Sequence, residues 1–208
     1  MTCPVHKRKL LFGVAKNDAD YTVQVMSRSG GKVVRESTCP FYSRWYDMLR
    51  RCYSKRSLIK RPTYSKVTVC DEWLTFSNFS SWMKSQDWEG KHLDKDLIGR
   101  GNSEYSPARC IFISPELNVF IKDSIRSKNN LMVGVSWHKR DKVFTSQCYD
   151  TLQRKLVHLG YFSSELEAHE KYLKYKIGLI PKLKCKGLIS EEEENLLYSW
   201  YMSKGEQK

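Results

Sequence analysis

The segment 91–120 concentrates residue types that phosphate-ester chemistry uses. His92, Asp94, Lys95 and Asp96 lie in one short stretch. Carboxylates hold divalent metals, and a histidine takes up a proton near neutral pH, whereas a lysine does so only if its pKa is strongly depressed. The stretch could therefore support metal-dependent acid–base chemistry, or it could be the solvated end of a hairpin.

Residues 42–120 as a whole carry a recognisable pattern, "YSRWYDMLRRCY…VTVCDEWLTFSNFSSWM…LDKDLIGRGNSEYSPARCIFISPELN". This pattern resembles phage and bacterial proteins of the HNH endonuclease group, which implies a ββα-metal fold. The first strand would be Leu93–Asp96 and the second Cys110–Ile113. Ser114 and Pro115 would then open a helix that presents Asn118.

The HNH resemblance also implies roles for individual residues. Asp94 and Asn118 occupy the positions that hold one divalent metal, Mg²⁺ or Mn²⁺, which would stabilise charge on the scissile phosphate. Lys95 stands in the slot of the catalytic histidine, and Arg109 in that of the middle asparagine. His92 could replace the missing histidine, although its side chain is expected elsewhere on the strand. The catalytic candidates are Lys95, Asp96 and His92.

A second module is predicted over residues 133–178. Gly134–Arg140, Lys142–Cys148 and Lys155–Leu159 have the pattern of three short strands, and Ser164 with Glu167 forms a capping-box motif at the start of a helix. "GVSWHKR…KVFTSQC…KLVHLGYFSSELEAHEKYLKYK" resembles the AP-two/ERF DNA-binding domain of plant ethylene-response factors over residues 133–176. Ser136 stands where that family usually has Arg, and Phe144 where it has Trp.

The AP-two/ERF resemblance implies that the sheet enters the major groove of duplex DNA. Alternate strand residues would then reach phosphates and base edges. The candidates are Ser136, His138, Arg140, Lys142, Phe144, Ser146, Lys155 and Val157.

The charge of the chain favours the same partner. Its formal net charge is +13, and a polyanion is the usual partner of such a chain. Residues 44–66 hold eight basic residues against Asp47 alone, about half of that net charge. A phosphate-facing surface is expected there, with Arg50, Arg51, Lys55 and Arg56 as candidates, although a solvated helix face is the plain alternative.

Hydropathy places no element in a membrane. An acidic membrane competes with DNA as partner, but no apolar run approaches the about 20 residues of a span, and no signal-peptide stretch follows Met1. A cytoplasmic location is expected, in a bacterial host if the chain is phage-encoded. Seven scattered cysteines without a CxxC pair indicate reduced, mostly buried thiols, with zinc ligation as the minor alternative.

These patterns together predict an α+β protein in five parts. Residues 1–40 form a strand or hairpin region, 41–121 the HNH-like domain, 122–132 a linker, 133–178 the AP-two/ERF-like domain, and 179–208 a helical extension capped at Ser190. The function expected is a metal-dependent, site-preferring, homing-type DNA endonuclease. The alternative is a non-catalytic DNA-binding regulator or inhibitor that keeps a degenerate nuclease fold.

Overall fold

A computed structural model describes residues 9–98, 101, 103–122 and 131–205. Helices take 42% and strands 26% of the described residues, so the expected α+β class is confirmed. The chain divides into two compact units. The first comprises residues 1–89 and 98–112, and the second 90–97 and 113–208.

The first unit begins with a β-hairpin, as the alternating pattern before Ser29-Gly-Gly predicts. β1 (Gln24–Ser29) pairs antiparallel with β2 (Lys32–Thr38). Gly30 and Gly31 form the turn with φ values of 57° and 77°. Glycine meets this demand without the steric cost that a side chain would bring.

The core of the first unit is aromatic and lies between two helices. α1 (Pro40–Tyr53) buries one stripe, formed by Tyr42, Trp45, Met48, Leu49 and Cys52. α3 (Phe76–Lys84) buries Phe76, Phe79 and Met83 against it. The Trp45 indole donates a 2.6 Å hydrogen bond to the Trp73 carbonyl oxygen, so the buried indole N–H is satisfied.

Short elements complete the first unit. They are α2 (Lys55–Lys60), the 3₁₀ turns η2 (Pro62–Tyr64) and η3 (Asp71–Leu74), and the strands β3 (Thr68–Val69) and β5 (Glu104–Tyr105). β3 and β5 are parallel, and Val69 lies opposite the buried Tyr105.

A strand–strand–helix element lies at the positions along the chain where the sequence predicts one. β4 (His92–Asp94) pairs with β6 (Ile111–Ile113), whose last residue belongs to the same unit as β4. α4 (Pro115–Lys122) follows, and the Ser114 hydroxyl accepts the Leu117 amide hydrogen to cap it. α4 buries Leu117, Phe120 and Ile121.

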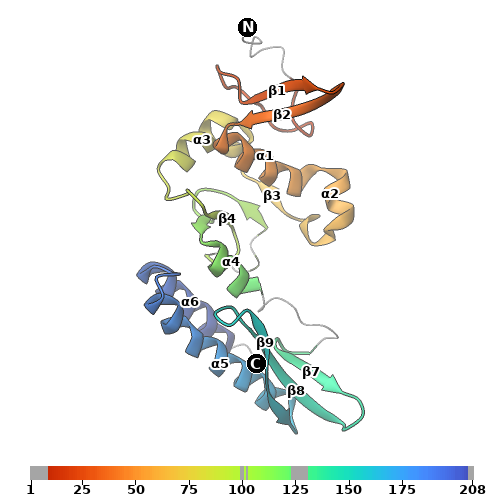
Figure 1. The fold of residues 1–208 in the computed structure, drawn as a ribbon, viewed down its shortest axis with the longest axis vertical. Coiled ribbons are helices and arrows are strands. Elements are labelled where there is room, and N and C mark those ends of the chain that lie inside the picture. The colour runs from red at the N-terminus through yellow and green to blue at the C-terminus, as the bar shows by residue number, and fades with distance from the viewer. Residues whose placement is uncertain (1–8, 99–100, 102, 123–130, 206–208) are drawn as a thin grey trace. The chain divides into compact units, whose positions relative to one another are not determined.

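A three-stranded antiparallel sheet forms the rest of this unit. Its strands, in spatial order, are β7 (Val135–His138), β8 (Val143–Asp150) and β9 (Lys155–Phe162). α5 (Glu165–Cys185) lies along one face of the sheet (Figure 1). α6 (Glu191–Gly205) packs on α5 and carries the buried Leu197, Trp200 and Tyr201.

Capping bonds mark both helix starts where the sequence places them. Ser164 accepts the Glu167 amide hydrogen at 3.2 Å, while the Glu167 carboxylate turns to the Ser163 hydroxyl. At α6 the box is complete, because Ser190 and Glu193 each accept the other's backbone amide hydrogen.

The unit boundaries differ from the predicted domain boundaries. The predicted limit at residue 178 falls inside α5, which continues to Cys185 because a buried stripe including Leu179, Ile180 and Leu183 extends through its last turns. α4 belongs with α5 and α6, since the Phe120 ring lies under the Lys176 ammonium at 4.1 Å and 5.9 Å from the Tyr201 ring. The predicted linker lies mostly outside the described residues.

Candidate functional site

The ββα element of the second unit brings two of the predicted residues together. The alternation of side chains along a strand places His92 and Asp94 on one face of β4, with the buried Leu93 on the other. The His92 Nδ1 atom lies 2.7 Å from the amide nitrogen of Asn118 on α4. His92, which was expected only as a substitute for the missing catalytic histidine, is therefore the side chain that Asn118 contacts.

Asp94 is fixed by its own turn. Its Oδ1 atom accepts the amide hydrogens of Asp96 at 2.9 Å and Leu97 at 2.8 Å. Burial raises the pKa of Asp94 above its ordinary value, and these amide bonds offset the rise only in part. A nearby cation would stabilise the charged carboxylate in this place.

The donor set is compatible with magnesium or manganese only as a sparse site. Asp94 and Asn118 offer the hard oxygen ligands that these ions prefer, and Mg²⁺ commonly keeps several waters beside one or two protein ligands. The Asn118 side chain, however, contacts His92. In the part of the chain that the structure describes, no three His, Cys, Asp or Glu side chains are grouped to hold a metal.

Lys95 and Asp96, both predicted as catalytic, bind each other. β4 ends at Asp94, and the turn that follows directs Lys95 inward, where the residue is 7% exposed. Its ammonium lies 2.5 Å from the Asp96 carboxylate. An ion-paired ammonium has no lone pair with which to accept a proton, so this geometry argues against Lys95 as a general base. Arg109, in the slot of the middle asparagine, is exposed.

The β7–β9 sheet presents a second candidate surface, on the side away from α5. Strand register aligns Ser136 with Thr145 and Tyr161, and Gln147 with His158. We call this side the open face. Its polar and aromatic residues are Ser136, His138, Thr145, Gln147, His158 and Tyr161, of which Thr145 is buried, and the apolar Val143 and Leu156 share the side. Contacts within it confirm the shared side. The Ser136 and Thr145 hydroxyls lie 2.7 Å apart, and the Tyr161 ring centroid is 4.7 Å from that of His158.

The opposite side of the sheet is covered by α5. Val135, Ser146 and Cys148 are buried there, and the Asp150 carboxylate accepts the Tyr175 hydroxyl hydrogen from the helix at 2.8 Å. Ser146, predicted to contact DNA, is fully buried and cannot do so in this fold. Register and alternation place Phe144, Lys155 and Val157 on this side as well, with the Phe144 ring 4.8 Å from Trp137.

Along β8 the predicted DNA contacts Phe144 and Ser146 thus lie on the side that α5 covers. Thr145 and Gln147 face away from the helix, together with His158 and Tyr161. Ser136 and His138, two of the predicted DNA contacts, lie on the open face. Cys148, an apolar and β-compatible residue, carried the signal that could have assigned the phase of β8, because it is the type most often buried.

Cations gather at the turn between β7 and β8. Lys139, Arg140 and Lys142 are exposed there with the single acid Asp141, which lies 2.8 Å from the Arg140 Nε atom. Lys142 has a φ of 54°, so its backbone is in the left-handed region. Long, exposed cations beside a sheet face can reach the phosphates that flank a groove.

In the first unit, the predicted basic candidates separate by exposure. Arg50 pairs with Asp47 at 2.9 Å, and Lys55 and Arg56 are exposed on α2. Arg51 is instead hydrogen-bonded to the buried Tyr105 hydroxyl. That guanidinium supports the interior of the unit, so it is not available to a phosphate in this structure.

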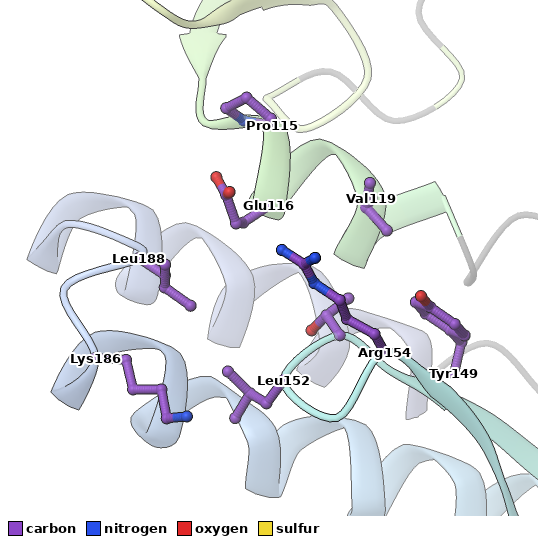
Figure 2. Close-up of a pocket in the computed structure, with 9 residues that line it drawn as sticks. Pro115, Glu116, Val119, Tyr149, Leu152, Arg154, Lys186 and Leu188 are labelled. Atoms are coloured by element: carbon purple, nitrogen blue, oxygen red, sulfur yellow. The ribbon is translucent and has the colours of Figure 1, made fainter.

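The second unit also contains a pocket of about 340 Å³ beside α4 (Figure 2). Its charged lining residues are Glu116, Arg154 and Lys186, and Figure 2 shows the Arg154 side chain extending toward α4. Tyr149, Leu152 and Leu188 supply apolar walls. Charges of both signs line this pocket. None of the predicted site residues is among its lining residues.

In comparisons with known proteins, no family model, curated protein or solved structure matches the chain. The two resemblances therefore rest on the sequence motifs alone. Across the described residues, no helix has the length and apolar character needed to cross a membrane.

Proposed function

We propose that this protein binds duplex DNA through the open face of its β7–β9 sheet. The observation that carries the proposal is the sorting of the sheet into two sides, one covered by α5 and one presenting Ser136, Gln147, His158 and Tyr161. Hydroxyl, amide and imidazole groups are the donors and acceptors that read base edges in the major groove. The AP-two/ERF-like motifs and the net charge of +13 support the same partner.

In this proposal the polar strand residues and the cations of the β7–β8 turn make different contributions to binding. Gln147, at the centre of β8, can form the bidentate contact with adenine N6 and N7 that glutamine side chains make. Exposed cations at the β7–β8 turn, including Arg140 and Lys142, position the sheet by binding phosphates, which adds affinity without sequence preference.

Site selection from a random duplex pool, followed by fluorescence anisotropy on the full chain, tests the proposal. Gln147→Ala should relax base preference at one position, at about 1–3 kcal/mol of discrimination. Lys142→Asn, which tolerates the positive φ, should weaken all sequences and lower the salt slope by about 0.9. Lys182→Gln is the control, because Lys182 is exposed on α5, which covers the other side of the sheet.

The result that refutes the proposal is specific. If Gln147→Ala, Lys142→Asn and the Lys182→Gln control all bind with equal affinity and preference, the open face does not contact DNA. Preference for single-stranded RNA over duplex would refute it as well.

A second candidate function, metal-dependent hydrolysis of a phosphodiester, is favoured by the contact between His92 and Asn118. The Asn118 amide nitrogen donates to Nδ1, so the neutral imidazole carries its hydrogen on Nε2. Rotation of the Asn118 amide by 180° would let its oxygen accept the Nδ1 hydrogen and leave Nε2 with the lone pair of a general base. His92 would then deprotonate the attacking water, and Asn118 would hold the imidazole in that tautomer. A Mg²⁺ or Mn²⁺ ion at Asp94 would stabilise charge on the phosphate.

Plasmid nicking on DNA that carries the selected site distinguishes the assignments. With Mg²⁺ or Mn²⁺, His92→Ala and Asp94→Asn should abolish nicking and leave DNA affinity unchanged, since affinity comes from other residues. Asn118→Ala should shift the pH profile as well as the rate. Lys95→Met should retain the nicking activity if Lys95 has only a structural role. Tight binding without metal-dependent nicking would instead support the non-catalytic alternative.

A further inference from the structure

The β1–β2 hairpin, which we call the ribbon, extends from the first unit with both sides exposed. Every residue of β2 before Thr38 is exposed, and Val33 and Met26 retain 61% and 51% of their accessible surface. No described residue covers either side of the ribbon. A two-stranded hairpin is only marginally stable alone in water, so this length of exposed ribbon suits a bound state.

The register sorts the ribbon residues by side. Arg28 lies opposite Val33, and Met26 opposite Arg35, and side chains two positions apart share a side. One side therefore carries two guanidiniums and two apolar side chains. The other side carries Ser27, Ser29, Lys32 and Val34.

Charge selects the class of partner. The ribbon holds Arg28, Lys32 and Arg35 against Glu36 alone, a net charge of +2. Among the described residues, neither Arg28 nor Arg35 has an ion-pair partner. A second copy of the same ribbon would bring like charges together, which is unfavourable, whereas a polyanion would neutralise them.

Size selects duplex DNA and one of its grooves. Six paired residues span about 20 Å, and two paired strands lie about 4.8 Å apart. The tight Gly30-Gly31 turn keeps the tip no wider than the strands. The major groove is about 12 Å wide and about 8.5 Å deep and admits a two-stranded ribbon. Arginine is the residue that most often reads guanine O6 and N7, and apolar side chains contact the thymine methyl group.

We propose that the ribbon inserts into the major groove, with Arg28 and Arg35 on guanine edges and Met26 and Val33 against the floor of the groove. This contact lies in the first unit and is separate from the open face of the second. The chain would thus hold duplex DNA at two places, which increases affinity through effective concentration as long as both can be engaged at once.

Dimethyl sulfate footprinting and anisotropy test the ribbon on the full chain, with a duplex selected from a random pool. The wild-type chain should protect guanine N7 atoms at two separate tracts. Arg28→Gln with Arg35→Gln should lose protection at one tract only and weaken binding about tenfold or more. Lys171→Gln with Lys182→Gln removes the same charge from α5 and is the matched control.

Three outcomes would overturn the proposal. One is an affinity loss no larger than that of the control pair, and another is unchanged protection of both tracts. The third is a ribbon variant that alters the oligomeric state in sedimentation while leaving DNA affinity intact, since this would identify a second copy as the occupant. The Gln147→Ala variant separates the two proposals, because it relaxes the base preference of the open face in site selection whether or not the ribbon binds.

Discussion

Replacing Gly134 by alanine should destabilise the second unit more than any other single methyl group added at a described glycine. Gly134 precedes β7 with a φ of 81°, and a Cβ atom there would lie 2.2 Å from Cγ of Tyr172. Tyr172 is 1% exposed and lies in the middle of α5. Its ring carbons cannot move away without displacing the helix from the sheet.

Two physical costs add for this substitution. An L-residue in the left-handed region costs about 1–2 kcal/mol. Overpacking a filled core costs about 1–3 kcal/mol, and a gap of 2.2 Å belongs to the upper part of that range. The expected loss in the free energy of unfolding is therefore about 2–5 kcal/mol.

Gly178→Ala is the matched control, since Gly178 lies inside α5 with nothing within 4 Å of the added atom. That variant should gain about 0.5–1 kcal/mol from helix propensity. Urea denaturation measures both, and hydrogen exchange of β7–β9 amides localises the loss. Equal and opposite small changes, or a Gly134→Ala loss below about 1 kcal/mol, would contradict the close approach of Gly134 to Tyr172.

Two other predictions concern stability. Burial raises the pKa of Asp150, but its bonds from the Leu152 and Gln153 amides and from Tyr175 outweigh this and place it below the ordinary value. This stabilisation is complete above the unfolded-state pKa of about 4 and is lost as the pH falls through the folded-state pKa. Asp150→Asn should therefore flatten the acid limb of a curve of unfolding free energy against pH. An unchanged acid limb would contradict the prediction. Ser190→Ala should cost about 1 kcal/mol by urea denaturation, and adding Glu193→Ala should cost little more, because the two residues act as one capping box. Fully additive losses would show that they do not.

Local patterns predicted most of the elements correctly. The apolar stripe of α1, the glycine turn of the ribbon and the cap at Ser190 each depend on neighbours within a few residues, so the sequence contains what is needed. The length of α5 was harder to predict from the sequence. Pro181 near its end would suggest an earlier stop, yet Ile180 and Leu183 remain buried and the helix continues to Cys185.

The site residues were harder to predict because they depend on phase and on distant contacts. Thr145, Ser146 and Gln147 are all polar, so alternation along β8 does not say which side the helix covers, and a shift of one residue exchanges the two sides. The contact between His92 and Asn118 joins residues 26 positions apart. Only the pairing of β4 with β6 and the start of α4 bring them together.

The order in which the units occur along the chain has a consequence for synthesis. The chain leaves the first unit after residue 89, returns at 98 and leaves again after 112. A ribosome that has released residue 112 has delivered all of the first unit, while residues 90–97 must wait for α4 and the sheet before they can fold. For the same reason no single cut separates the units, and a gene fragment that begins after residue 112 would lack β4. Recombination could exchange such units only by three coordinated crossovers, after residues 89, 97 and 112, so His92 would normally be inherited together with the first unit.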